Sequence, residues 1–511
     1  MTNNIVRQLN DYESMLATST CSVGMELLLL CPDGNDDNMN TTDDDDNDDD
    51  DDDGDIGIYA REAWYRTVAE RKQLQVKLIK LPGDASTGPL GQQQQQQRYA
   101  LSDLQFDDAR KLFVVETLVE PEEALPDLVA SLKAVGTTCM DERMGSFYVL
   151  CRVTETKKGE KEKRLQIIIS MTNALSDGPG ILQVAKSFLS HFDNVLQGVV
   201  SDMPKVMIQP PLDLQATILG NDYGKLTNED KTAYESHGEF ETAIGKKKQL
   251  YKMADGATVL PTEPQQNIPS DAKKLGSESN IVDIIPFSLS AEDTALLNQH
   301  CNLRKCSIQG ALVAAALVAR LKALGGEDKY PWPVYSAVLV PANMRPFGGA
   351  DEDQCLCGSA DIWFTTRLSG NSVREYWNVA KQATDRIRKG LQLDQQNEWY
   401  RRLFVTPSKM PKYSMMVSHL GVAPIDAQYG KIKVETLRYF GTSPHADKPS
   451  KEQTTMIHSI IFRDEFHGHF NFSSPGVSKE FAIDLALDIE ETLRQLAKSS
   501  LPQPSLSSSQ C

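Results

Sequence analysis

The sequence predicts two lobes of mixed α/β structure joined by a long connection. Strand and helix patterns alternate in both halves of the 511-residue chain, which is too long for one ordinary hydrophobic core. Between the halves, residues 209–279 are polar with scattered proline, glycine and lysine, which is typical of a connection between domains. We therefore expect an N-terminal lobe at 1–208, a C-terminal lobe at 280–498 and a disordered tail at 499–511.

The N-terminal half contains strands and helices interrupted by two low-complexity inserts. One insert is the aspartate- and asparagine-rich stretch at 33–55, and the other, at 82–97, ends in six glutamines. Both are expected to be disordered, because neither can bury enough apolar surface to fold. A calcium site in the aspartate run is a weaker alternative, since calcium loops need glycine and spaced ligands in a fixed turn. The predicted elements are strands at 22–31, 111–119, 146–154 and 164–171, and helices at 58–71, 121–134 and 181–196.

The C-terminal half has the same alternation. The segment SIQGALVAAALVARLKAL is so apolar that its helix must be buried on nearly all sides. The predicted elements are strands at 281–289, 334–341, 413–419, 430–438, 454–463 and 467–473, and helices at 290–302, 307–324, 372–391 and 478–497.

Charge and cysteine content exclude several classes of protein. Thirteen aspartates lie between Asp36 and Asp55, so the rest of the chain has a net charge of only −5 rather than −18. No basic stripe is available to neutralise phosphates, and nucleic acid is therefore not an expected partner. The nine cysteines lack zinc-finger spacing, which favours reduced thiols in the cytoplasm and no structural metal. The polar N-terminus is not a secretory signal, and the longest apolar runs are too short for a transmembrane segment.

The segment MTNALSDGPG at 171–180 carries the functional prediction. It follows a continuous apolar run, typical of a strand buried on both faces, and it precedes the amphipathic helix. Ser176 or Asp177 can cap that helix, and Pro179 lies in the first turn, where its missing N–H costs nothing. Taken alone, the segment is an ordinary strand-to-helix turn.

Together with its flanking blocks, the segment resembles the HHxxxDG signature of the chloramphenicol acetyltransferase-like superfamily. This superfamily includes condensation domains of peptide synthetases, polyketide-associated acyltransferases and fungal alcohol acetyltransferases, and the chain is most similar to the last. The flanking blocks are YAREAWYRTVAERKQLQVKLI, LSAEDTALLNQHCNLRKCSIQGALVAAALVARL, VLVPANMRPF and MMVSHLGVAP. The resemblance implies two chloramphenicol acetyltransferase-like lobes with a channel between them.

The resemblance also implies positions for the site residues. The two signature histidines fall on Thr172 and Asn173, and the second of them is the family's general base. Asp177 is implied to be structural, paired with Arg345 from the other lobe, and Thr172 and Gly178 to line the substrate channel. A donor that stabilises the tetrahedral oxyanion is expected from the channel wall, where Ser418 is the candidate.

Asn173 changes the expected activity. An amide cannot take a proton from an alcohol, and losing a general base typically costs ~10²–10⁴-fold in rate. None of the eight histidines has an aspartate four residues later, so no second signature is present. His419 is a candidate for a displaced base, although a histidine near the centre of a sheet is more often structural. His467 and His469 share one face of a predicted strand, but a metal site would need a third ligand.

Two functions of different classes are consistent with these residues. The first is an enzyme that moves an acyl group from the co-substrate acyl-CoA to a small alcohol or amine, working as a monomer with no bound cofactor. The second is a catalytically inactive relative that binds a ligand or another protein. The fold favours the first function, and the missing histidine favours the second.

Overall fold

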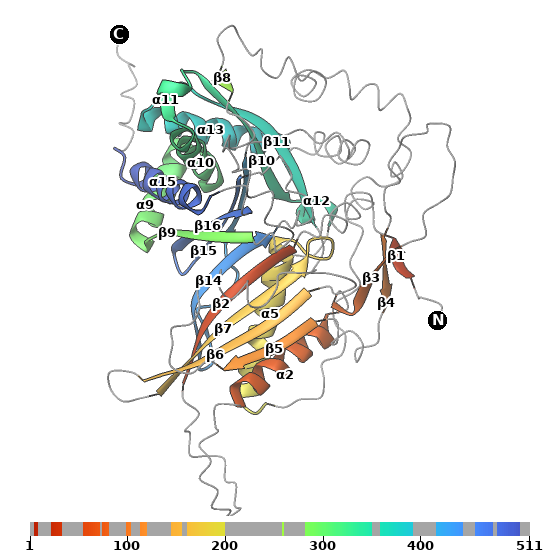
Figure 1. Ribbon diagram of the computed structural model, residues 1–511. Helices are drawn as coiled ribbons and strands as arrows, with labels where there is room; N and C mark the ends of the chain where they lie inside the picture. Colours follow the sequence, from red (N-terminus) through yellow and green to blue (C-terminus); the bar gives the residue numbers. More distant parts are fainter. Residues whose placement is uncertain are drawn as a thin grey trace, which may run out of the picture. The chain divides into compact units, whose positions relative to one another are not determined.

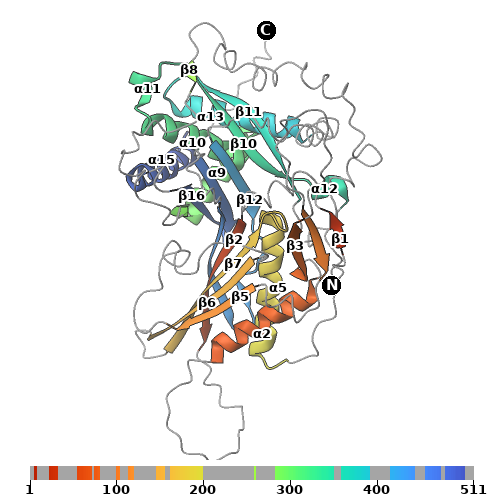
Figure 2. The ribbon, with the colours of Figure 1, turned by 45° about the vertical axis from the view of Figure 1, so that its right-hand side comes forward.

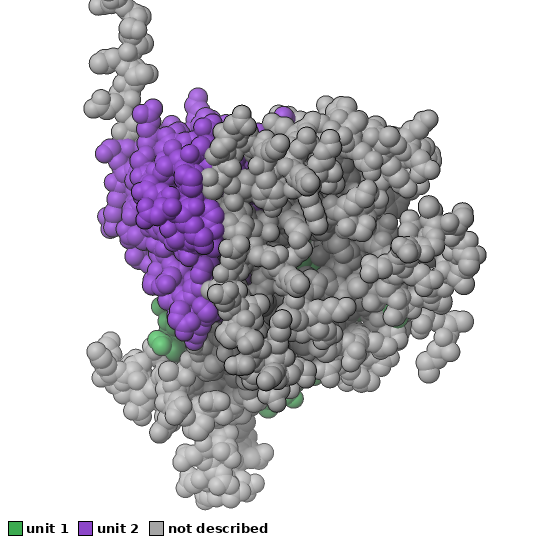
Figure 3. All heavy atoms as spheres, turned by 45° about the horizontal axis from the view of Figure 1, so that its top comes forward, with its two compact units in different colours: residues 1–214, 349–358, 423–444 green, residues 215–348, 359–422, 445–511 purple. Residues whose placement is uncertain are grey.

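The computed structural model describes the parts of the chain that form two compact units. Unit 1 comprises residues 1–214, 349–358 and 423–444, and unit 2 comprises residues 215–348, 359–422 and 445–511 (Figure 3). Residues 349–358 and 423–444, which the sequence analysis assigns to the C-terminal lobe, therefore belong with the N-terminal one. The described residues are 5–8, 22–32, 55–71, 74–80, 99–103, 113–119, 145–155, 161–199, 258–259, 282–349, 358–391, 415–442, 455–473 and 478–500.

Unit 1 is built on a six-stranded sheet with two helices on one face (Figure 2). Its strands are antiparallel except for the parallel pair β5–β6. In sheet order they are β13 (Gln428–Tyr429), β14 (Ile432–Thr442), β2 (Ser22–Pro32), β7 (Lys161–Thr172), β6 (Gly145–Glu155) and β5 (Phe113–Val119). The helices are α2 (Asp55–Glu70) and α5 (Gly178–Leu196), and a small separate sheet contains β1 (Ile5–Gln8), β4 (Tyr99–Asp103) and β3 (Val76–Lys80).

Strand β14 reaches this sheet from the far end of the sequence. It pairs antiparallel with β2, and the buried carboxylate of Glu26 on β2 accepts a hydrogen bond from Arg438 Nη1 on β14 at 2.9 Å. The same carboxylate accepts one from Gln166 Nε2 on β7 at 2.5 Å. Gly24 lets β14 approach, because any Cβ there would lie 2.1 Å from the ring of Phe440. A buried, paired charge of this kind specifies which strands pair and in which register.

Unit 2 is built on a seven-stranded sheet, with its long helices gathered on one side (Figure 1). In sheet order the strands are β11 (Ser359–Leu368), β10 (Val334–Asn343), β12 (Met415–Val422), β15 (Thr455–Phe462), β16 (Glu465–Ser473) and β9 (Val282–Leu289), while β8 (Thr258–Val259) pairs with β10. The helices are α9 (Ala291–Arg304), α10 (Ile308–Ala323), α13 (Val373–Gly390) and α15 (Lys479–Ala497), with two short ones, α11 (Gly326–Lys329) and α12 (Arg345–Gly348).

Helix α10 lies inside the helical layer, as its composition predicts. Ser307 caps it by accepting a hydrogen bond from Gly310 N at 3.1 Å, and residues 310–321 are all buried. Among the described residues, no single helix is long and apolar enough to cross a membrane. Helices α9 and α10 together have the required length and apolar composition, but they are bent by 104° relative to each other.

The preceding helix, α9, ends in a Schellman motif that brings two cysteines together. Lys305 adopts the left-handed conformation, and Cys306 N donates to Cys301 O at 2.9 Å. Cys301 and Cys306 therefore occupy the two positions that often make an apolar contact in such motifs, and both belong to the same buried core. Burial raises the pKa of the Cys301 thiol to about 12, so it acts as a small apolar side chain.

Most of the predicted elements agree with the structure, but the strands β1, β4, β8, β11 and β13 were not predicted. The helix predicted at 121–134, nearly all of the inserts at 33–55 and 82–97, and nearly all of the connection at 209–279 lie outside the described residues. Strand β11 was not predicted, although Ile362, Thr366 and Leu368 alternate on one face and are buried. Of the tail predicted at 499–511, Ser499 and Ser500 are described, and they accept hydrogen bonds from Trp377 and Arg304.

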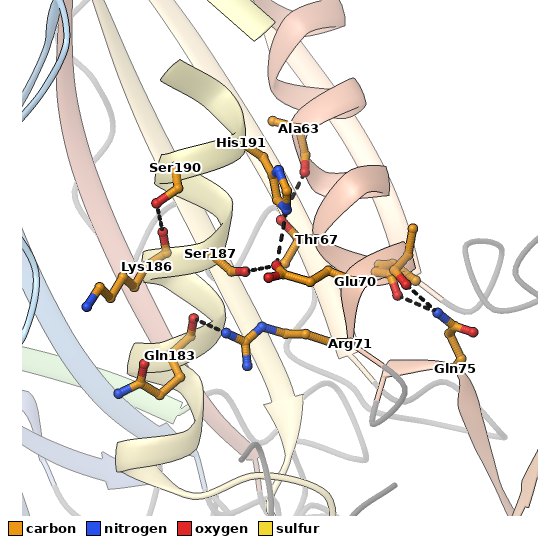
Figure 4. Close-up of polar contacts among 12 residues, drawn as sticks. Ala63, Thr67, Glu70, Arg71, Gln75, Gln183, Lys186, Ser187, Ser190 and His191 are labelled. Carbon is orange, nitrogen blue, oxygen red and sulfur yellow. Dashed lines mark hydrogen bonds and ion pairs between the residues drawn. The ribbon is translucent and has the colours of Figure 1, made fainter. Parts of the chain in front are cut away.

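A cluster of polar side chains joins the two helices of unit 1 (Figure 4). Glu70, the last residue of α2, accepts hydrogen bonds from Ser187 Oγ and His191 Nε2 on α5, the latter at 3.1 Å. Arg71 also donates to Gln183 O at 3.0 Å. Serine and histidine both bind the carboxylate instead of each other, so the histidine does not activate the serine as it would in a catalytic triad. The cluster is therefore a structural link between α2 and α5.

We predict that Glu70→Gln reduces the free energy of unfolding by about 1–2 kcal/mol at pH 7, because hydrogen bonds to a carboxylate are stronger than those to an amide. The bond from His191 lowers the pKa of Glu70 below its ordinary value of 4.5. The ionised Glu70 carboxylate therefore contributes its full stabilisation above pH 4.5. This stabilisation is lost as the pH falls through the lowered pKa of the folded protein. Urea unfolding at pH 7 and pH 3.5 should show the variant and the wild type converging in acid.

The matched control is Glu62→Gln. Glu62 lies on the same helix and forms an i,i+4 pair with Arg66 at 2.8 Å, with 37% of its side chain exposed. It should change stability by no more than about 0.5 kcal/mol. Equal effects of the two substitutions would contradict a specific role for Glu70.

Candidate functional site

The turn predicted to carry the catalytic residue follows the central strand of unit 1. Strand β7 pairs with β2 on one side and β6 on the other, so its backbone is fixed along its length. After Thr172 the chain turns, and the amides of Leu175 and Ser176 both donate to Thr172 O, at 3.0 and 3.1 Å. Helix α5 begins at Gly178, with proline in its first turn. The strand-to-helix geometry predicted from the sequence is confirmed.

Asn173 is the position in this turn at which a side chain is accessible. All the other residues from Met171 to Gly178 are buried, and Asn173 is half-buried. Asn173, where the resemblance places the second signature histidine, is therefore more exposed than the neighbouring residues of the turn. Its amide has no basic nitrogen at neutral pH, so it can donate or accept a hydrogen bond but cannot remove a proton.

Asp177 organises the backbone around the turn. It is the N-cap of α5, where Oδ1 accepts from Gly180 N at 3.0 Å. Its second oxygen, Oδ2, accepts from Gly358 N at 3.0 Å, and Gly358 belongs to the segment that joins unit 1 from much later in the sequence. Both carboxylate oxygens therefore bind backbone amides, which is a structural role.

Arg345 begins the short helix α12 in unit 2 and is fully buried. Asn343 Oδ1 accepts hydrogen bonds from its backbone N at 3.1 Å and its Nη1 at 3.2 Å. Asp177 and Arg345 belong to different units, and their pairing stays a prediction.

Ser418 and His419 lie on opposite faces of strand β12 in unit 2. Val417 is part of the core beneath the helices, and Gln309 of α10 donates to its carbonyl oxygen at 2.8 Å. Since side chains alternate along a strand, His419 shares the helix-covered face with Val417, and Ser418 points to the other face. The two residues grouped in the sequence analysis therefore have different surroundings.

His419 has the surroundings of a structural histidine. Its Nδ1 lies 3.0 Å from Ser459 Oγ, and its ring stacks on Phe466 with the centroids 5.7 Å apart. Burial lowers the pKa of His419 to about 4, so its imidazole is neutral and only weakly basic at pH 7. The geometry favours the structural role over that of a displaced base.

Ser418 begins a row of polar side chains that the sequence analysis did not assemble. His458 on β15 lies directly opposite Ser418, and His469 on β16 lies opposite His458. The register of these strands could not be read from local sequence, so the row was missed. No group of three metal-ligating side chains is found within the described ranges, and His467 and His469 thus have no third ligand there.

Comparison with known proteins finds similarity in structure only. No protein-family model matches the sequence, and no curated protein matches it either. Among solved structures, the chain is similar to the TRI3 trichothecene 15-O-acetyltransferase from Fusarium sporotrichioides, with a TM-score of 0.63 and 10% identity over 96% of this chain and 94% of that one.

Two other solved structures match over nearly their whole length. The first condensation domain of the calcium-dependent antibiotic synthetase gives a TM-score of 0.59 with 12% identity, covering 98% of each chain. Polyketide synthase associated protein 5 from Mycobacterium tuberculosis gives 0.57 with 12% identity, covering 97% of this chain and 99% of that one. At such low identity, these matches establish the fold alone.

We predict that Asp177→Asn separates the two structural roles of this carboxylate. Asparagine caps a helix as well as aspartate does, but its Nδ2 cannot accept from the second amide, that of Gly358, so the loss would be about 1–3 kcal/mol if the residue only binds backbone amides. If Asp177 also neutralises buried Arg345, removing the charge should cost about 3–5 kcal/mol. Thermal and urea unfolding of Asp177→Asn and Asp177→Ala would distinguish these cases.

The control is Ser290→Ala, which removes a cap and no charge. Ser290 Oγ accepts from Asp293 N at 3.1 Å at the start of α9. Its loss should cost about 1 kcal/mol. If Asp177→Asn is no more destabilising than Ser290→Ala, the predicted pair with Arg345 does not exist.

Proposed function

We propose that this chain, which has the chloramphenicol acetyltransferase-like fold also found in condensation domains, transfers an acyl group from acyl-CoA to a small alcohol or amine. The observation that supports this most directly is the turn at 172–178. It keeps the structural aspartate and presents residue 173 outward, although the residue there is asparagine. In this proposal the protein works as a cytoplasmic monomer with acyl-CoA as its co-substrate.

The TRI3 neighbour is named as an O-acetyltransferase, and this supports oxygen as the acceptor atom. In the proposed reaction, the acceptor oxygen or nitrogen attacks the thioester carbonyl carbon and a tetrahedral oxyanion forms. The carbon–sulfur bond then breaks, and coenzyme A leaves as its thiolate. The proton of the acceptor passes to solvent or to the departing thiolate, because Asn173 cannot receive it.

The missing base sets the expected rate. Orientation of the two substrates and stabilisation of the oxyanion survive without a base, so the reaction should be slowed by ~10²–10⁴-fold and not abolished. Ser418 is the donor expected from the sequence for the oxyanion.

The second candidate is a catalytically inactive relative that binds a ligand or a protein partner. The amide at position 173 favours it, since the chemistry of the signature is lost while the fold is kept. The two candidates differ in one measurable property, the release of free coenzyme A thiol.

We predict that Asn173→His increases acyl transfer by ~10²–10⁴-fold, because it restores a group that can accept the acceptor proton near neutral pH. Thiol release would be measured with acetyl-, butyryl- and longer acyl-CoA, with and without mixed alcohols. Asn173→Ala is the matched control, since it changes the side chain without adding a base, and it should show no gain.

The outcomes separate the two candidates. Acceptor-dependent turnover by the wild type above a heat-killed control supports the enzyme. Activity that arises only in Asn173→His shows an intact site that lacks its base. If the wild type, Asn173→His and Asn173→Ala all release no thiol, the result supports the inactive relative.

A further inference from the structure

Helix α13 presents a row of exposed cations on the surface of unit 2. It packs on α10 and β11, and its buried residues are Tyr376, Trp377, Val379, Ala380, Ala383, Thr384 and Gly390 (Figure 1). Arg374, Lys381 and Arg388 are exposed and follow one another at every seventh position. They therefore project within about 40° of one another around the helix axis, with neighbours about 10.5 Å apart along it.

Two exposed cations from neighbouring segments widen this row into a cationic face. Lys305, in the turn after α9, lies beside the last turn of α13, because Arg388 Nη1 donates to its carbonyl oxygen at 3.2 Å. Arg367 on β11 lies beside the middle of α13, because the side chain of Gln382 binds both its backbone N and its backbone O. The sequence analysis found no basic stripe, since this one depends on helical periodicity and on segments that are distant in the sequence.

The cationic face differs in charge from the rest of the protein. Its exposed cations are Lys305, Arg367, Arg374, Lys381, Arg388 and Lys389, and its carboxylates are those of exposed Asp385 and half-buried Glu375. Six cations and two carboxylates give the face a net charge of +4, in a chain whose net charge is −18. Such a local reversal of sign attracts anionic partners and steers them to one place.

Helix stability does not account for this face. Arg374 lies in the first turn of α13, where a cation opposes the helix dipole, whereas Arg388 and Lys389 lie in the last turn, where cations are favoured. Lys381 pairs with Asp385 at 3.2 Å. Among the residues that the structure describes, neither Arg374 nor Lys389 forms an ion pair. Their charges are therefore free to bind a partner.

We propose that the cationic face is a docking surface for an acidic peptide segment of another protein. Carboxylates of this segment pair with Arg374, Lys381 and Arg388, and the net charge of the face brings the segment to it. The inference is independent of acyl transfer, because none of these residues belongs to the turn after β7.

The composition of the face favours an acidic peptide over nucleic acid or a membrane. A nucleic-acid strand carries a charge about every 3.4 Å, roughly three times as densely as the cations of the row. Asp385 lies within the row and repels a continuous phosphate backbone. The exposed residues of α13 include no aromatic side chain that could stack on a base and no large apolar one that could enter a membrane.

Peptide binding to the full-length protein tests the proposal. The probe is a fluorescent alanine-rich peptide of about 20 residues, long enough to span the row, with glutamates along one face. Its anisotropy should show binding in about 0.02 M salt and at least ~10-fold weaker binding in about 0.3 M salt, because salt screens exposed charges. The same peptide with lysine in place of glutamate should not bind. Absence of binding by the glutamate peptide, or equal binding of both peptides, overturns the proposal.

Four variants locate the binding on α13. Arg374→Glu should weaken it by ~3–10-fold and Lys381→Gln by ~2–5-fold, since removing one exposed ion pair costs at most about a factor of five. Asp385→Asn should strengthen it by ~2–5-fold, because it removes the carboxylate within the row.

The matched control is Lys479→Glu. Lys479 is an exposed cation in the first turn of α15, so this substitution changes the net charge as much as Arg374→Glu does. A carboxylate is favourable in the first turn of a helix, and both variants should stay folded, which thermal unfolding verifies. Lys479→Glu should leave peptide binding within about twofold of the wild type. Equal weakening by both substitutions, or no gain in Asp385→Asn, contradicts docking on this face.

Two further measurements identify the occupant. A carbodiimide condenses a lysine amine with a carboxylate in contact with it, so it should link Lys389 to glutamates of the bound peptide. If Lys389 is linked instead to the aspartates at 36–55, the chain's own acidic insert occupies the face and the proposal is wrong. A single-stranded RNA of about 20 nucleotides should bind more weakly than the peptide in about 0.15 M salt. Tighter binding of the RNA, weakened by Arg374→Glu, assigns the face to nucleic acid and overturns the proposal.

Discussion

The carboxylate of Asp177 is the interaction on which the rest of the unit 1 site depends. One oxygen fixes the start of α5, and the other fixes a backbone amide that is 181 residues away in the sequence. With both ends held, the turn after β7 has little freedom, and the direction of residue 173 follows from it. The backbone of this turn is therefore fixed independently of the side chain at position 173.

The two units place polar groups inside sheets in different ways. In unit 1, Glu26 is satisfied by Arg438 and Gln166 from the two neighbouring strands, so the network is closed and holds the sheet together. In unit 2, Ser418, His458 and His469 form a polar row across three neighbouring strands, and Asn471 Nδ2 lies 2.9 Å from His458 Nδ1. The first arrangement closes a network around one buried carboxylate, and the second lines up buried polar side chains on three neighbouring strands.

Local sequence predicted much of this structure because many of its determinants are local. Caps such as Ser307, the apolar run of β7 and the composition of α10 act within a few residues. Strand β11 was missed, although Ile362, Thr366 and Leu368 carry a period-two pattern.

The polar row of unit 2 could not be predicted, because it depends on register. The hairpin β15–β16 turns through Arg463 and Asp464, which both have positive φ, of 52° and 63°. This is the backbone of a two-residue hairpin turn, yet Arg-Asp is not one of its usual sequences. Unless this turn is recognised in the sequence, the register that pairs His458 with His469 cannot be predicted. The place of β14 in the sheet of unit 1 could not be predicted for the same reason, because the sequence of neither strand alone indicates that β14 pairs with β2.

The pairing of β14 with β2 has a consequence for how the chain is made. Residues 26 and 438 are 412 positions apart, so a ribosome must synthesise most of the protein before the sheet of unit 1 is complete. Until then β2 is an open edge rich in leucine, of the kind that pairs with other chains. Closing so long a loop also slows folding. The boundary at 208 predicted from the sequence would thus be a poor place to cut the gene, since an N-terminal fragment would lack its own edge strand.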